Sequence, residues 1–129
     1  MFKITFITIG GTYKLTLTTA TAVKNFLPQG GTAGAFTQNY NNATSTSAGV
    51  FAGQLVALKL NVAFDAAGKI GTNSTDLGVL AIATGPFTGM SVNAFLSLAE
   101  QAIGGGSLSG YTFSQFNDAA TAINENFDN

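Results

Sequence analysis

The chain has 129 residues, a length that suits one domain, and 46% of them are apolar, which is enough for a hydrophobic core. Only 9% are charged and the formal net charge is −1, so small neutral polar groups must cover the surface, which favours association. Cys and His are absent, which excludes disulfides, thiolate sites and the common zinc and transition-metal sites, and no cofactor is predicted. Because Arg is also absent and the lysines are scattered, a nucleic-acid partner is not expected.

Residues 1–19 show the period-two alternation of a β-hairpin. Their apolar side chains fall on one face, Lys and Thr fall on the other, and Gly10-Gly11 forms the turn. An isolated hairpin is only marginally stable, so the rest of the chain must cover this face. A free hairpin edge can also add a strand from a neighbouring chain. The predicted strand-edge or assembly contacts are Phe2, Ile4, Phe6, Tyr13, Leu15 and Leu17.

A short helix and a long loop are predicted next. Residues 21–27 place their apolar side chains on one helical face, with Thr19 or Thr21 as the N-cap and Pro28 as the stop. Residues 30–47 are rich in Gly, Asn, Thr and Ser, a composition that is typical of a loop.

The mostly apolar run that follows, residues 47–66, has two interpretations. As a helix it gathers its polar side chains on one narrow stripe, and Ser47 is a candidate N-cap. As a strand, residues 58–64 alternate between apolar and polar side chains. The length of the run, about 18 residues, favours the helix, while the strand alternative for residues 58–64 stays open. The polar stripe would consist of Gln54, Asn61 and Asp65.

The last part of the chain predicts one short apolar segment and two helices. Residues 77–84 are apolar and bounded by turn signals, which indicates a buried strand or an extended segment on the core. Residues 91–103 predict a helix with one apolar face, which ends at Gly104 and the glycines after it. A further helix begins after Thr112, which can form a capping box with Gln115.

Together these elements predict an α+β fold in one domain, residues 1–129. A hairpin over residues 1–19 would form a small sheet packed with about three to four α-helices, one of them long, central and apolar. Residues 20–129 would form a mainly helical body with one short strand. No uninterrupted apolar run reaches the roughly 18 residues of a transmembrane helix, so no membrane span is predicted.

The ionisable residues offer few catalytic options. Lys59 lies inside an apolar segment, and its expected role is a side chain that reaches solvent at a helix edge rather than a nucleophile or base. Paired carboxylates for glycoside hydrolysis would lack Trp or Arg to hold a sugar. Asp65 and Asp76 have the spacing of a calcium loop, but Ala67 and Lys69 stand at ligand positions. The chain is therefore predicted to be no enzyme and to bind no metal.

Three blocks in order along the chain carry a resemblance. They are residues 25–32 (NFLPQGGT), 45–65 (STSAGVFAGQLVALKLNVAFD) and 123–128 (INENFD). From Ala20 onward the chain resembles an uncharacterised module of secreted, surface-associated proteins, mainly of Bacteroidetes-type bacteria. The resemblance implies an extracellular or cell-surface location and a scaffold or adhesive setting, and it brings no catalytic residues.

Two functions of different classes are expected from these observations. The first is a non-catalytic extracellular structural module that assembles into a filament, layer or matrix, with copies of itself or neighbouring domains of a surface protein as partners. The alternative is a monomeric carbohydrate- or surface-binding adhesion domain, in which Tyr13, Tyr40 and Tyr111 contact a glycan. A hydrolase is a third hypothesis, and it requires two acids that face one cleft.

Overall fold

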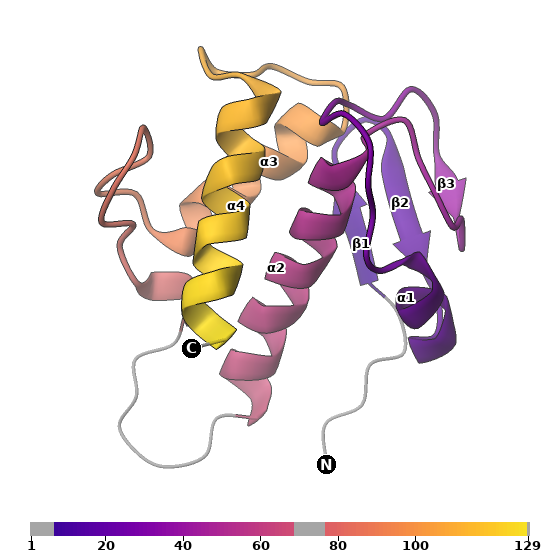
Figure 1. Cartoon of the computed structure of the whole chain (residues 1–129), viewed down its shortest axis with the longest axis horizontal. Coiled ribbons are helices and arrows are strands. Elements are labelled where there is room, and N and C mark those ends of the chain that lie inside the picture. Colours follow the sequence, from indigo (N-terminus) through magenta and orange to yellow (C-terminus); the bar gives the residue numbers. More distant parts are fainter. Residues whose placement is uncertain (1–6, 69–76, 129) are drawn as a thin grey trace.

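A computed structural model describes residues 7–68 and 77–128, which form an α+β fold (Figure 1). In these ranges the chain has a three-stranded N-terminal sheet, four α-helices and one short 3-10 helix. The strands are β1 (Ile7–Gly10), β2 (Lys14–Leu17) and β3 (Tyr40–Asn41). The helices are α1 (Ala20–Phe26), α2 (Val50–Gly68), η1 (Leu77–Val79), α3 (Val92–Ile103) and α4 (Phe113–Asp128). The predicted fold class, a small sheet packed with three to four α-helices, is confirmed.

The predicted hairpin is present over the described residues. β1 and β2 pair antiparallel, with Ile7 opposite Leu17 and Ile9 opposite Leu15, and all four side chains are buried in the core. The apolar face of the hairpin is therefore covered, as its alternation requires. The first three predicted assembly contacts lie outside the described residues: Phe2, Ile4 and Phe6.

A third strand lies inside the segment that was predicted as a loop. β3 pairs in parallel with β2, which becomes the middle strand of the sheet. Asparagines on both sides of β3 hold it in place, since Asn39 Oδ1 accepts the Lys14 N–H at 2.9 Å and Asn42 Oδ1 accepts the Thr18 N–H at 2.8 Å. Such side-chain bonds to the main chain leave no period-two pattern in the sequence.

α2 includes residues 58–64, so the helical interpretation is right and the strand alternative is wrong. The helix begins at Val50 and not after Ser47, because the Ser47 hydroxyl donates to the Ala35 carbonyl at 2.8 Å instead of capping the helix. Gly49, just before Val50, has a φ of +59°, a left-handed conformation that glycine adopts without steric cost, and so forms the turn before the helix.

α2 is the longest helix in the described ranges, with 19 residues, and it lies between the sheet and α4 (Figure 1). The expectation that this helix is apolar is not confirmed, because its polar side chains bind neighbouring elements. Asn61 donates to the Asn124 side chain at 3.0 Å, and Asn124 donates to the Gln54 side chain at 2.8 Å. None of the helices in residues 7–68 and 77–128 has the length and apolarity needed to cross a membrane.

Polar caps set the first turns of the other helices. The side-chain oxygen of Thr19 caps α1, and that of Ser91 caps α3. Before α4, the Thr112 N–H donates to Gln115 Oε1 at 2.9 Å, and the Gln115 N–H donates to Thr112 Oγ1 at 3.0 Å. This reciprocal pair is the predicted capping box.

Residues 77–84 do not form a buried strand, which was one of the two structures predicted for them. Leu77 is buried in η1, but the side chains of Val79 and Leu80 are 60% and 45% exposed. After η1 the chain is extended, and it pairs with the residues before α3 at one bridge, Ala81 opposite Ser91. The strand prediction is wrong because no strand of the described chain lies beside this segment to continue the pairing. The alternative, an extended segment on the core, is the closer description.

Candidate functional site

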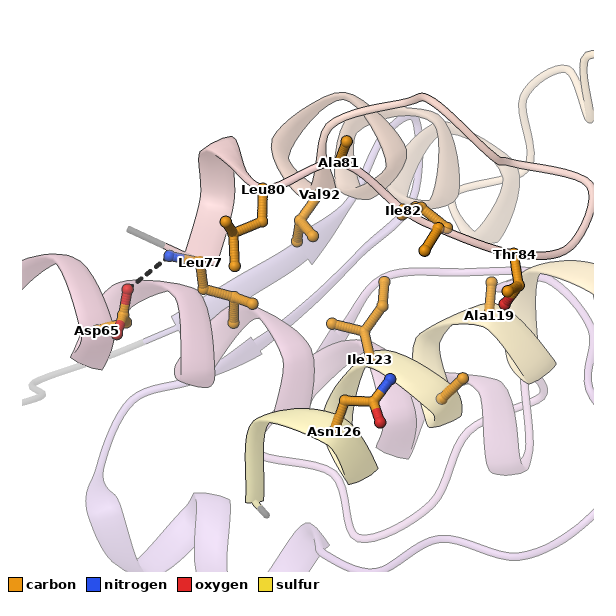
Figure 2. A pocket seen from close by; sticks show the side chains of 12 residues that line it. Asp65, Leu77, Leu80, Ala81, Ile82, Thr84, Val92, Ala119, Ile123 and Asn126 are labelled. Carbon is orange, nitrogen blue, oxygen red and sulfur yellow. Dashed lines mark hydrogen bonds between the residues drawn. The ribbon is translucent and has the colours of Figure 1, made fainter. Parts of the chain in front are cut away.

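A groove of about 500 Å³ lies between the 77–84 segment and α4, and is called the α4 groove below (Figure 2). Leu80 and Ile82 point into it from one wall, and Ile123 points into it from α4 (Figure 2). Its apolar lining consists of Leu77, Leu80, Ala81, Ile82, Ala83, Val92, Ala119, Ala122 and Ile123. The polar lining residues are Asp65, Thr84 and Asn126.

Asp65 anchors one end of the α4 groove. Its carboxylate, on the last turns of α2, accepts the Leu77 N–H at 2.6 Å and so fixes the start of η1 (Figure 2). A carboxylate that accepts a main-chain N–H forms a charge-assisted hydrogen bond, which is among the stronger ones in proteins. Asp65 is the one charged residue among the described lining residues. The rest of the described wall is therefore uncharged and mostly apolar.

The extended part of the segment uses one of its two edges for hydrogen bonds. The Leu80 carbonyl accepts the Val92 N–H at 3.0 Å, and the Ile82 N–H donates to the Met90 carbonyl at 2.8 Å. The Ile82 carbonyl in turn accepts the Gly89 N–H at 2.8 Å. The main-chain groups of Leu80 and Ile82 therefore face the residues that lead into α3.

The other edge of the segment has no main-chain partner among the described residues. In an extended chain, successive residues point their main-chain groups to opposite sides, so those of Ala81 and Ala83 face away from the residues before α3. Within residues 7–68 and 77–128, neither Ala81 nor Ala83 forms a main-chain hydrogen bond, and both are exposed. The side chains alternate in the same way, since Leu80 and Ile82 enter the α4 groove while Ala81 points away (Figure 2). The site thus combines an extended edge, which has no partner in the described part of the chain, with an apolar wall.

α4 provides the opposite wall through residues that share one helical face. Ala119, Ala122, Ile123 and Asn126 follow the three- and four-residue spacing of neighbours on a helix. The two alanines leave room between α4 and the segment. The sequence pattern did not indicate this groove, because alanines beside an apolar core stripe are equally typical of close packing. The sequence signal that could have indicated the groove is the apolar composition of residues 77–84. Leu77 is buried there, whereas Val79 and Leu80 are exposed.

Lys59 and Glu100 form an ion pair, and both bind the main chain of β1. Lys59 Nζ donates to the Thr8 carbonyl at 2.6 Å and lies 3.1 Å from Glu100 Oε1, which also accepts the Gly10 N–H at 3.2 Å. Thr8 and Gly10 are two residues apart, so their main-chain groups face the same side of β1, away from β2. The ion pair therefore covers the outer edge of β1 over these residues.

The hairpin residues predicted as edge contacts lie in different surroundings. Leu15 and Leu17 are buried in the core on β2, which has β1 on one side and β3 on the other. They are therefore core residues and do not form a free edge. Tyr13 lies in the hairpin turn, where its side chain is 38% exposed and its N–H donates to the Gly104 carbonyl at 3.0 Å.

The other two tyrosines predicted as glycan contacts have partners of their own. The ring of Tyr111 lies 4.2 Å from that of Phe87, centroid to centroid, within an aromatic cluster of the core. Tyr40 packs edge-on against Phe36 with centroids 5.5 Å apart, and its hydroxyl donates to Ser47 Oγ at 3.2 Å. Hydrogen bonds with the hydroxyl and the N–H of Ser47 lower the pKa of Tyr40 below its ordinary value, since the N–H donates to the phenol oxygen at 3.1 Å, although burial opposes this. The described contacts do not bring the three tyrosines together into one binding surface.

The described acidic residues do not form a metal site. In residues 7–68 and 77–128, no three acidic side chains gather into a group that could hold a metal ion. Of the calcium-like pair, Asp65 accepts the Leu77 N–H, and Asp76 lies outside the described residues.

Comparison of the chain with protein-family models, with curated proteins and with solved structures gives no match. The function of the chain is therefore inferred from its own residues.

Proposed function

We propose that this chain is a non-catalytic extracellular structural module that assembles with copies of itself or with neighbouring domains of a surface protein. The observation that carries the proposal is the α4 groove, an apolar surface beside an extended edge that has no partner among the described residues. Soluble monomers rarely expose contiguous apolar surface, and where they do the surface is usually an interaction site. Leu80, 45% exposed at the rim of the groove, is the clearest sign of such a surface.

The positions of the ionisable groups support a non-catalytic role. Lys59, Glu100 and Asp65 each bond to a main-chain group of another element. A general base or nucleophile has to reach a substrate proton or a reacting atom, and side chains used to fasten β1 and η1 are poorly placed for this. These residues are better explained as connections between elements.

The low charge supports assembly through apolar contact. A net charge of −1 and a charged fraction of 9% give copies little reason to repel one another. Contacts of this kind also depend weakly on salt, because screening acts on charges and not on buried apolar surface. The extracellular location rests on the resemblance of three sequence blocks to a module of secreted surface proteins.

Sedimentation velocity over a wide concentration range tests the proposal. We expect the mean mass to rise with protein concentration and to stay unchanged or increase when salt is raised from about 50 mM to about 1 M. A chain that remains monomeric at all concentrations and salt levels would contradict self-assembly. If that monomer bound a glycan array, and if substitution of Tyr13 abolished the signal, the adhesion domain would replace it.

A further inference from the structure

We infer that the α4 groove receives the first six residues of a second copy, added as a strand beside Ala81–Ala83. This inference rests on the proposed function, because it names the surface and the segment through which copies associate. The occupant has to be an extended polypeptide, since the site offers main-chain groups along a strand edge next to an apolar wall.

The groove prescribes the pattern of its occupant. A strand beside Ala81 and Ala83 would exchange main-chain hydrogen bonds with these residues, which have none within the described chain. Its alternate side chains would point into the groove next to Leu80 and Ile82, facing Ile123 (Figure 2). Among the described residues, the lining has no basic side chain and one carboxylate that is already bonded, so these inward side chains have to be apolar and uncharged.

The first residues of the chain have this pattern. Phe2, Ile4 and Phe6 alternate with Lys3 and Thr5, so one face of an extended strand would be apolar and the other polar. Six extended residues span about 20 Å, which is more than the three residues Ala81–Ala83 need, about 10 Å at the same rise per residue. The donor therefore has the required pattern and is long enough to cover this edge.

The position of β1 favours a second copy as the donor. β1 starts at Ile7 and lies on one side of α2, whereas the 77–84 segment and α4 lie on the other side (Figure 1). α2 therefore stands between β1 and the groove of the same chain, which favours a donor from another copy. A copy with one donor segment and one separate groove forms a head-to-tail contact, which continues into an open chain of subunits unless a ring closes.

Four full-length variants test this inference. Ile4→Asp puts a charge on the donor face, and Thr5→Asp puts the same charge on the opposite face as its control. Leu80→Asp puts a charge in the groove, and Val79→Asp is its control because Val79 is exposed and does not line the groove. Circular dichroism and the melting temperature establish that each variant is folded, and Leu80→Ser replaces Leu80→Asp if the latter is not.

Mass photometry and sedimentation velocity of each variant and of a mixture give the readout. We expect Ile4→Asp and Leu80→Asp to be monomeric alone, with association weakened at least tenfold, and both controls to assemble like the wild type. A one-to-one mixture of the two defective variants should form dimers and nothing larger, since the intact donor of one fits the intact groove of the other.

The possible failures are distinguishable. A wild-type chain that never associates contradicts the proposed function and this inference with it. If the Ile4→Asp and Leu80→Asp variants assemble as well as the wild type, the inference is overturned and assembly proceeds through another surface. The same holds if a mixture of these two variants stays monomeric. Dimers of the Ile4→Asp variant alone would have the same consequence.

Discussion

The Nζ atom of Lys59 lies 3.1 Å from the carboxylate of Glu100, and each side chain also bonds to a main-chain group on the outer edge of β1. Covering an edge strand with charged side chains is one way in which proteins prevent unwanted strand addition. The sheet edge next to α2 is therefore closed over Thr8–Gly10, whereas the edge of Ala81–Ala83 has no partner within residues 7–68 and 77–128. This contrast is why assembly is assigned to the α4 groove and not to the hairpin.

Removing the lysine should destabilise the fold. In Lys59→Met the Thr8 carbonyl loses its partner and Glu100 loses its counter-ion, so we expect the free energy of unfolding to fall by about 1 to 3 kcal/mol. Lys24→Met, at an exposed position of α1, should change it by less than about 0.5 kcal/mol. Urea unfolding followed by circular dichroism measures both. Equal effects of the two substitutions would mean that Lys59 does not fasten β1.

Asn124 connects α4 to α2 through a buried amide. It donates to the Gln54 side chain at 2.8 Å and accepts from Asn61 at 3.0 Å. Asn124→Ala leaves both partners unsatisfied, and we expect a loss of about 1 to 3 kcal/mol of unfolding free energy. Glu125→Ala, at the exposed neighbouring position, is the control and should be close to neutral. A melting temperature unchanged in Asn124→Ala would contradict a structural role of the amide.

The capping box before α4 should behave as a unit. Thr112→Ala removes the acceptor for the Gln115 N–H and should lower the unfolding free energy by about 1 kcal/mol. Gln115→Ala removes the reciprocal bond, and the double variant should lose less than the sum of both single losses. Chemical denaturation of the three variants completes the cycle. Strict additivity would show that the two bonds are independent.

Tyr40 should make the stability depend on pH in the alkaline range. Its hydrogen bonds with the hydroxyl and the N–H of Ser47 lower the pKa of its phenol from the ordinary value of 10.0, so the folded state loses the Tyr40 proton more readily than the unfolded state. The resulting stabilisation is absent well below the folded pKa, grows as the pH rises through it, and is complete above the unfolded value. The difference in unfolding free energy between wild type and Tyr40→Phe should therefore widen towards pH 10 and beyond. A difference that stays constant or shrinks would show that the phenolate is not favoured in the fold.

The helices could be predicted because their signals are local. The caps at Ser91 and Thr112 lie next to the residues that they serve, and the helical apolar faces repeat within a few residues. The fold class followed from the same signals together with the alternation of the hairpin.

The features that depend on distant contacts could not be predicted. β3 consists of two residues, and its pairing depends on Asn39 and Asn42, which bind residues of the hairpin region far away in sequence. The 77–84 run has the composition of a buried strand, yet only a tertiary contact determines whether a strand lies beside it. The α4 groove likewise depends on how that run faces Ala119 and Ala122, a relationship that no sequence spacing contains.

Amide hydrogen exchange at Ala81 and Ala83 tests the central claim most directly, because these two N–H groups are the ones that strand addition would bond. We predict that both exchange slowly in the assembled wild type and rapidly in the monomeric Ile4→Asp variant, while the amide of the exposed loop residue Gln38 exchanges alike in both. Rapid exchange at Ala81 and Ala83 in the assembled wild type would contradict strand addition at this edge.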